Sequence, residues 1–229
     1  MIQTENENHM IVKELITGII TPLTLSDSAA FGLGIMDEFK VSHLPVVQDM
    51  IFQGLISDTD IYNFNNLDEP LVNYKANLGQ VSVTENQHIY DAINLFSAQS
   101  LSLLPVVSGS NQYLGIITQT TLIQHLAGLF AINNPGGVII LEINEKDYDL
   151  PAIARIVTSN DAKVLSLSLT SFPDSTKLEV TLKLNKMDIE ALLQTFNRFN
   201  YSVKASFSEP SNYESLKERF DSLMNYLSV

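Results

Sequence analysis

Apolar residues recur along the first half of the chain in two matching blocks. In each block, an apolar stripe at helical spacing precedes two short apolar runs that a polar turn separates. The runs cover 44–47 and 52–56 in the first block, and 103–107 and 113–117 in the second. A short helix is expected after each second run. The pattern therefore predicts two copies of a strand–helix–strand–strand–helix unit.

The two blocks also share a phrase of sequence. Residues 43–47 read His-Leu-Pro-Val-Val, and residues 103–107 read Leu-Leu-Pro-Val-Val. In both copies the next apolar run contains a glycine and ends on a hydroxyl residue, Ser57 in the first copy and Thr118 in the second. Because the phrase returns once, about sixty residues later, we expect two small units that pack as a pseudo-symmetric pair with a ligand cleft between them.

Polar residues ahead of the two long helical stripes predict where these helices begin. Ser26 or Asp27 is expected to cap a helix that continues to about Phe39. In the second copy, Thr84 is the expected cap, and Gln87 three residues later is typical of a capping box.

The second half of the chain shows a different alternation after the break at Pro135-Gly136-Gly137. It predicts a split βαβ, ferredoxin-like unit over residues 136–208. Asp149 is the expected cap of its first helix and Asn185 that of its second. Residues 209–229 are expected to form a terminal amphipathic helix. The expected elements are strand 138–143, helix 150–159, strands 164–172 and 178–184, a helix ending at 200, and strand 201–207.

Charge and composition limit the class of protein. The chain has a net charge of −13, and residues 1–135 hold thirteen acidic and only three basic residues. Such a surface repels phosphate backbones, so we expect no nucleic-acid partner. No apolar run is long enough for a membrane span, and the polar start at residues 1–9 is unlike a signal peptide. The lack of cysteine fits a cytoplasmic protein.

Motifs for catalysis and metal binding are missing from the sequence. It contains no HExxH, no CxxC, no G-x-S-x-G elbow and no glycine-rich phosphate loop. Gly32-x-Gly34 falls inside an expected helix, where small residues favour close packing. We therefore nominate no catalytic residue, no metal ligand and no cofactor, and expect a protein that is not an enzyme.

The repeated phrase resembles the CBS domain, and its two copies resemble a CBS pair, or Bateman module. The resemblance covers about residues 10–130, with copy one at about 10–64 and copy two at about 76–130. The second half resembles an ACT domain, and the whole chain is similar to CBS–ACT regulatory proteins related to acetoin-utilisation proteins. The implied fold is α+β: a tandem βαββα pair, a βαββαβ ACT-type domain and a C-terminal helix.

The CBS resemblance implies a site for an adenosine-type ligand. In the family, the serine or threonine and the aspartate of this phrase hold phosphate and ribose, and the base lies between apolar strands. Carried over, these roles fall on Ser57 and Asp60. A helix start at Ser57 offers free N–H groups to an anion, and Asp60 offers acceptors to a sugar diol. The residues expected to face them are Val81, Leu103, Leu104 and Pro105.

The second copy departs from the family pattern. Thr118 matches the hydroxyl position, but Thr121 stands where the ribose-binding aspartate is expected. One hydroxyl holds a diol less well than a carboxylate does. This second cleft, expected to include Thr21 and His43, is therefore predicted to bind weakly or not at all, which gives one nucleotide per chain.

The same charge count ranks the ligands. A triphosphate needs several cationic contacts or a metal ion, and residues 1–135 hold no arginine. We expect AMP, adenosine or S-adenosylmethionine to be favoured over metal-free ATP. The competing interpretation is that Ser57 is only a helix cap and Asp60 only a solvated first-turn acid.

Two roles remain open for the ACT-like half. An amino acid could bind near Asn144, Asp149 and Asn160, although this stretch lacks the glycine that ACT domains usually carry there. Pairing of sheets between chains is the favoured alternative. We expect a cytoplasmic homodimeric regulator that responds to a small molecule and acts on a partner enzyme, with a ligand-free oligomerisation module as the alternative.

Overall fold

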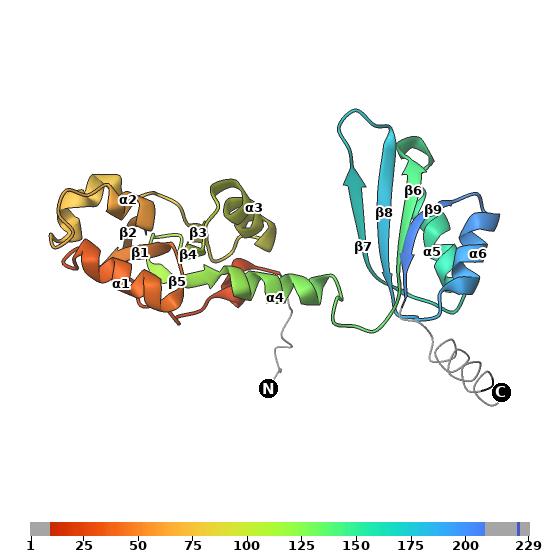
Figure 1. Cartoon of the computed structure of the whole chain (residues 1–229), viewed down its shortest axis with the longest axis horizontal. Helices are drawn as coiled ribbons and strands as arrows, with labels where there is room; N and C mark the ends of the chain where they lie inside the picture. The colour runs from red at the N-terminus through yellow and green to blue at the C-terminus, as the bar shows by residue number, and fades with distance from the viewer. Residues whose placement is uncertain (1–9, 209–223, 225–229) are drawn as a thin grey trace. The chain divides into compact units, whose positions relative to one another are not determined.

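The computed structural model describes residues 10–208 and Met224, which fold as two compact units (Figure 1). Unit 1 ends at His125 and unit 2 begins at Leu126, inside helix α4 (Gln119–Leu129). The sequence predicted a break slightly later, between 130 and 136. The terminal helix expected over 209–229 lies outside the described residues, apart from Met224.

Unit 1 contains both copies of the repeat, and each follows the expected order. In copy one the first strand is reduced to a bridge between Leu23 and Val46. The elements of copy one are η1 (Val12–Leu15), α1 (Ala29–Phe39), β1 (His43–Gln48), β2 (Ile51–Ser57) and α2 (Asp58–Tyr62). The linker and copy two contain η2 (Leu71–Asn77), β3 (Val83–Thr84), α3 (Ile89–Gln99), β4 (Leu103–Val107), β5 (Tyr113–Thr118) and α4.

The two copies have the same strand register. Val46 lies opposite Gly54 in the β1–β2 hairpin, and Val106 lies opposite Gly115 in the β4–β5 hairpin. Both hairpins shift register directly after that valine. A parallel partner accompanies each hairpin, the bridge at Leu23 in copy one and strand β3 in copy two. The sequence repeat is therefore a repeat of backbone geometry.

The segment leading into each copy crosses to the other copy. Thr17 and Ile116 of β5 exchange backbone hydrogen bonds of 2.8 and 3.1 Å. Gly79 and Leu55 of β2 exchange two bonds of 2.8 Å. These crossings join the two copies into one folded unit. A movement of one copy therefore displaces residues that are hydrogen-bonded to a strand of the other copy.

Gly54 and Gly115 stand where the crossing segments come closest. Their φ angles are +151° and +147°, which side chains rarely adopt. A Cβ on Gly54 would lie 2.5 Å from the Cβ of Leu78, and one on Gly115 would lie 2.5 Å from Cγ2 of Ile16. The crossing therefore requires glycine at both positions.

Helix α1 begins later than the sequence predicted. Its N-cap is Ser28, whose Oγ accepts a bond from the Phe31 N–H. The prediction of Ser26 or Asp27 was wrong because the Asp27 carboxylate accepts from the N–H of Thr24 and closes a turn ahead of the helix.

Two other predicted caps fail for a similar reason. The N-cap of α3 is His88, while the Thr84 N–H donates to Gln87 Oε1 and closes a preceding turn. Asn185 accepts from the backbone N–H of Lys163 at 2.6 Å and does not cap the following helix. The expected cap Asp149 is confirmed, since its Oδ1 accepts from the Ala152 N–H.

Unit 2 has the order strand, helix, strand, strand, helix, strand. Its strands form one antiparallel sheet, ordered β7-β8-β6-β9, and both longer helices cover the same face (Figure 1). This is the split βαβ arrangement that the sequence predicted. The elements are β6 (Val138–Asn144), η3 (Glu145–Asp147), α5 (Leu150–Thr158), β7 (Val164–Ser171), β8 (Lys177–Leu184), α6 (Glu190–Arg198) and β9 (Ser202–Phe207).

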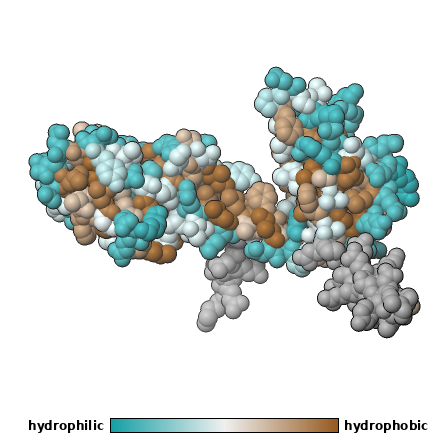
Figure 2. Space-filling model, viewed as in Figure 1, coloured by the Kyte–Doolittle hydropathy of each residue, from teal (hydrophilic) through white to brown (hydrophobic). Residues whose placement is uncertain are grey.

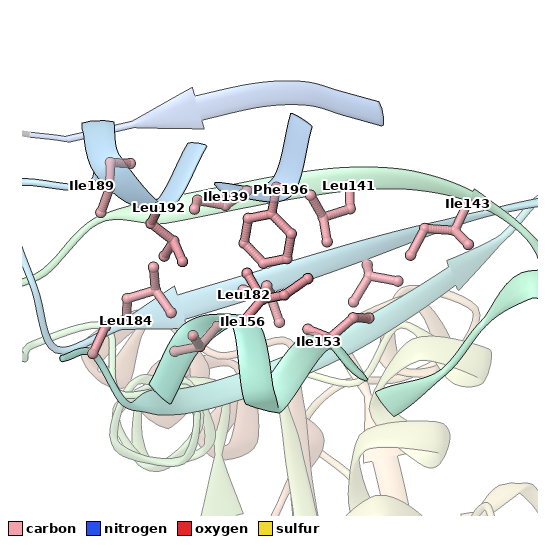
Figure 3. Packing of buried hydrophobic residues seen from close by; sticks show 13 residues of the cluster. Ile139, Leu141, Ile143, Ile153, Ile156, Leu182, Leu184, Ile189, Leu192 and Phe196 are labelled. Atoms are coloured by element: carbon pink, nitrogen blue, oxygen red, sulfur yellow. The ribbon is translucent and has the colours of Figure 1, made fainter. Parts of the chain in front are cut away.

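The core of unit 2 lies between the sheet and its two helices. Side chains of α5 and α6 point toward those of β6 and β8 (Figure 3). Phe196 of α6 is completely buried at the centre, against the alternating inward residues of β6. The opposite face of the sheet carries cross-strand ion pairs, Lys177 with Glu142 and Lys204 with Glu179. One apolar face and one polar face explain the alternation seen in the sequence.

Candidate functional site

Ser57 and Asp60 form a capping box at the start of α2. Ser57 Oγ accepts from the Asp60 N–H at 3.0 Å. Asp60 Oδ2 accepts from the N–H of Ser57 at 3.0 Å and from its hydroxyl at 2.6 Å. Both bonds end on Oδ2, and Oδ1 bonds to no other described residue. The box fixes the carboxylate while leaving one oxygen for a ligand.

The equivalent turn of copy two is built without a carboxylate. Thr118 Oγ1 accepts from the Thr121 N–H at 3.1 Å, and the two hydroxyl oxygens lie 2.9 Å apart. Copy two therefore keeps the hydroxyl-capped turn but lacks the negative charge that Asp60 brings to copy one. The two halves of unit 1 therefore differ chemically at one matched position, Asp60 against Thr121.

The strand register places each hydroxyl residue beside the start of the preceding strand of its own copy. His43 lies opposite Ser57 in the β1–β2 ladder, and Leu103 lies opposite Thr118 in the β4–β5 ladder. Each hydroxyl residue thus neighbours the strand of its own copy, because an antiparallel hairpin places the start of one strand beside the end of the next. His43 is therefore a neighbour of Ser57 within copy one, and Leu103 is a neighbour of Thr118 within copy two, while His43 also contacts Ser102, the residue before Leu103.

The remaining expected residues follow the same division. Val83 pairs in parallel with Val106, which sets Val81 beside the Leu104 level of copy two. The parallel bridge at Leu23 likewise sets the exposed Thr21 beside copy one. The structure therefore brings Thr21 and His43 to the Ser57 side, and Val81 to the Thr118 side.

Three residues expected to line the ligand cleft are fully packed. Leu103 and Leu104 are 0% exposed, and Pro105 is buried with them. A ligand therefore does not reach these side chains in this conformation. The exposed parts of the proposed site are therefore the first turn of α2 and its immediate neighbours.

His43 links the two copies, a contact that sequence reasoning missed. Its Nδ1 lies 3.1 Å from the Ser102 hydroxyl and accepts from the Ser102 N–H at 3.3 Å. The Ser102 hydroxyl also accepts from the Ser42 N–H at 3.0 Å. Ser42 and Ser102 precede the repeated phrase in each copy, and this matched pair of serines was the available signal.

The environment of His43 favours the neutral imidazole. Burial lowers the pKa of His43, and the negative charges of Asp58 and Asp60 oppose this shift without reversing it. The geometry agrees, because Nδ1 must stay unprotonated to accept from the Ser102 N–H. Protonation of Nδ1 therefore removes the bond from the Ser102 N–H, while the bond between Ser42 and Ser102 remains.

His43 should make the stability of the chain depend on pH. The folded pKa lies below the ordinary value of 6.5, so the unfolded chain binds the proton first as the pH falls. The contribution of neutral His43 to the free energy of unfolding is thus fully present above pH 6.5. It is lost as the pH falls through the pKa of His43 in the folded chain. His43→Asn, whose amide oxygen can still accept from Ser102, should lose less stability than wild type between pH 7.5 and pH 5. Denaturant unfolding at both pH values measures this difference, and equal losses would contradict it.

The three residues expected to hold an amino acid in unit 2 do not converge. Asp149 caps the start of α5, whereas Asn160 follows its end and bonds to the Ile156 carbonyl and to Thr195. Eleven residues of helical rise separate the two by roughly 16 Å. Asn144 bonds to Asp147 and lines a separate cavity of about 520 Å³. One amino acid cannot contact all three.

Side-chain clusters for a metal ion and helices that could span a membrane are both missing from the described part of the chain. No group of three histidine or acidic side chains is placed to hold a metal ion there. Within the same residues, no helix combines the length and apolarity needed to cross a membrane.

Comparisons with known proteins give a family match, a curated relative and several solved structures. The family model described as the CBS domain matches residues 79–128. An uncharacterized protein of Methanocaldococcus jannaschii is 30% identical over 97 residues, which are 42% of this chain and 32% of that protein. The chain thus spans about a third of the length of this curated relative.

Solved structures resemble about half of the chain. A CBS domain pair/ACT domain protein of Thermotoga maritima is 23% identical, with 52% of this chain and 98% of that chain covered and a TM-score of 0.47. CBSX2, solved in complex with AMP, is 22% identical, with 52% and 96% covered and a TM-score of 0.41.

The family assignment of unit 1 rests on the model match together with the internal repeat. The matched segment, 79–128, contains β3 to α4 of copy two. Copy one repeats the same elements, the same hairpin register and the same glycine. Unit 1 is therefore a tandem pair of CBS domains.

Proposed function

We propose that the CBS pair is a non-catalytic regulatory sensor that binds one adenosine-type ligand at the first turn of α2. The observation that carries the proposal is the asymmetry of an otherwise matched pair. Both copies keep the capped turn, but only copy one carries a carboxylate there, at Asp60. A carboxylate oxygen left over from a capping box suits a ribose diol, whereas the threonine pair does not.

Coupling between the copies supports a signalling role. The crossing segments tie β2 to Gly79 and β5 to Thr17, and His43 bonds to Ser102 across the interface. A ligand beside Ser57 that moves β1 or β2 changes all three links. Binding would then favour one relative arrangement of the copies, which is a shift between existing states. The activity of a partner enzyme that contacts unit 1 would then depend on the relative arrangement of the two copies.

Charge supports a ligand with few phosphates. Asp58 and Asp60 lie at the proposed site, and the basic residues of 1–135 are only Lys13, Lys40 and Lys75. AMP brings one phosphate group, adenosine brings none, and S-adenosylmethionine brings a positive sulfonium. Metal-free ATP would bring several negative charges without cationic partners.

A thermal-shift panel tests the proposal. The full chain is heated with AMP, adenosine, S-adenosylmethionine, and ATP with and without Mg²⁺. We expect at least one of the first three to raise the melting temperature, because a ligand that binds only the folded state stabilises it. Metal-free ATP should act more weakly. A panel in which no adenosine compound shifts melting, or in which metal-free ATP acts most strongly, would exclude this function.

An oligomerisation module is the second candidate. Tyr62 of α2 and Ile123 of α4 occupy matched positions and are 70% and 65% exposed. Apolar side chains repeated on two helices of one unit suit contact with a second copy of the chain. We propose homodimerisation through these helices, with the ACT-like unit 2 pairing through its sheet edge. The partially exposed Leu169 and Phe172 lie at β7, one edge of that sheet.

Dimerisation through α2 and α4 has a direct test. The double variant Tyr62→Ser and Ile123→Ser should shift the chain from dimer to monomer in light scattering after gel filtration. The exposed substitution Tyr90→Ser on α3 removes a similar area elsewhere and should leave the dimer unchanged. A wild-type chain that is monomeric at all concentrations would refute this candidate.

A further inference from the structure

A groove on the helical side of unit 2 has a composition unlike the rest of this acidic chain. It has a volume of about 510 Å³ and is lined by Ala152, Arg155, Ile156, Ser159, Phe199 and Tyr201. We call it the α5 groove. Figure 2 shows apolar surface over α5, with hydrophilic residues around it. The volume lies in the range of small-molecule sites, which combine apolar walls with a few polar groups.

The walls of the α5 groove are apolar and aromatic. Ile156 is 5% exposed, whereas Phe199, directly after α6, is 58% exposed. Such exposure of a phenylalanine ring beside a concave surface is costly unless something covers it. Tyr201 is half-buried beside it, and burial raises the pKa of its hydroxyl, with the charge of Asp149 adding to this and that of Arg155 opposing it. The hydroxyl therefore stays a hydrogen-bond donor.

One of the two arginines of the described residues lines this groove. Arg155 lines it, and its Nε donates only to the Pro151 carbonyl, at 3.4 Å. It forms no ion pair with another described residue. The guanidinium of Arg198 lies over the Phe199 ring, 5.7 Å from its centre. In a chain of net charge −13, an arginine without an ion-pair partner in an apolar groove favours a negatively charged occupant.

We propose that the α5 groove binds a small organic carboxylate with an aromatic or branched apolar body. The guanidinium of Arg155 matches a carboxylate in shape and charge. The apolar body would lie against Phe199 and Ile156. Since Arg155 is the cationic residue that lines the groove, the carboxylate of the ligand would lie at the Arg155 end. This site belongs to unit 2 alone and does not depend on the nucleotide site of unit 1.

Titration with simple carboxylates tests the α5 groove. Benzoate, phenylacetate and 3-phenylpropionate are added to the ¹⁵N-labelled full chain, and amide shifts are followed by NMR. We expect saturable shifts of Arg155, Ser159 and Tyr201 with at least one of them. The neutral 3-phenylpropan-1-ol should bind at least tenfold more weakly than the acid of the same length.

Two variants and one control separate a built site from general charge attraction. Arg155→Gln, at an exposed position, should weaken binding at least tenfold, and Phe199→Ala several-fold. Lys146→Gln removes one positive charge from the same unit outside the groove and should bind as wild type does. Absence of saturable binding by all three acids would overturn the proposal. The proposal would also be overturned if Arg155→Gln bound the acids as tightly as wild type does, or if Lys146→Gln lost as much affinity as Arg155→Gln. Unchanged thermal unfolding of Arg155→Gln verifies its fold.

Discussion

Replacing Gly115 with alanine should lower the free energy of unfolding by about 2–5 kcal/mol. The backbone there has a φ of +147°, which strains any residue with a Cβ. The new Cβ would also lie 2.5 Å from Cγ2 of Ile16 and 3.0 Å from the Thr17 carbonyl oxygen. Since Thr17 belongs to the crossing segment, relief of the clash would open the ladder that joins the copies. Denaturant unfolding of wild type and variant measures the loss.

Two further alanine variants make this test specific. Gly54→Ala, the equivalent change in copy one, should cost a similar amount because its Cβ meets Leu78 at 2.5 Å. Gly34→Ala lies in α1 with nothing within 4 Å and should stabilise the chain by about 0.5–1 kcal/mol. If Gly115→Ala were as harmless as Gly34→Ala, the crossing of the leading segments would not exist as described.

Changing Asp60 to asparagine should weaken AMP binding at least tenfold. A hydrogen bond to a charged group contributes about 1.5–3 kcal/mol, and each 1.4 kcal/mol is a tenfold change in affinity. The asparagine oxygen can still accept from the Ser57 N–H, so the capping box that holds the turn at 3.0 Å is largely kept. Calorimetric titration of the full chain with AMP measures the effect.

The matched position in copy two supplies the control. Thr121→Ala should leave AMP affinity unchanged, because we assign no ligand to the Thr118 turn. Thr121→Asp should add a weak second site and raise the stoichiometry toward two per chain. Equal losses from Asp60→Asn and Thr121→Ala would remove the asymmetry on which the proposed site rests.

The repeat made the architecture of unit 1 predictable from sequence. Pro45 and Pro105 occupy the same place in the shared phrase, and Gly54 and Gly115 occupy the same place in the following strand. These residues are repeated because the same backbone crossing occurs twice. In unit 2, strict alternation of apolar and polar residues predicted the strands for a different reason, since one sheet face packs on helices and the other meets solvent.

The sequence could not predict which segments cross between the copies. The crossings at Thr17 and Gly79 are single bridges, too short to leave a hydrophobic period. Without them, the partners of Ser57 in the other copy could be argued only from the family pattern. Helix starts were misplaced because side chains such as Asp27 and Gln87 close turns with the same bonds that caps use.

The candidate site was predictable in its residues but not in its exposure. Ser57 and Asp60 were nominated from the resemblance to the CBS family, and the structure adds that Asp60 Oδ2 accepts the bonds of the capping box. Burial of Leu103 and Leu104 depends on packing between the copies, and a buried apolar run looks the same in sequence whether it lines a cleft or fills a core. The α5 groove joins residues about forty-five positions apart, such as Arg155 and Tyr201, which no local motif connects.

A crystal structure of the full chain grown with AMP tests the central claim most directly. Our account predicts one AMP per chain, with its ribose hydroxyls within hydrogen-bond distance of Asp60 Oδ1 and its phosphate beside the first turn of α2. AMP held at the Thr118 turn instead, or crystals that exclude AMP at concentrations far above cellular levels, would contradict it.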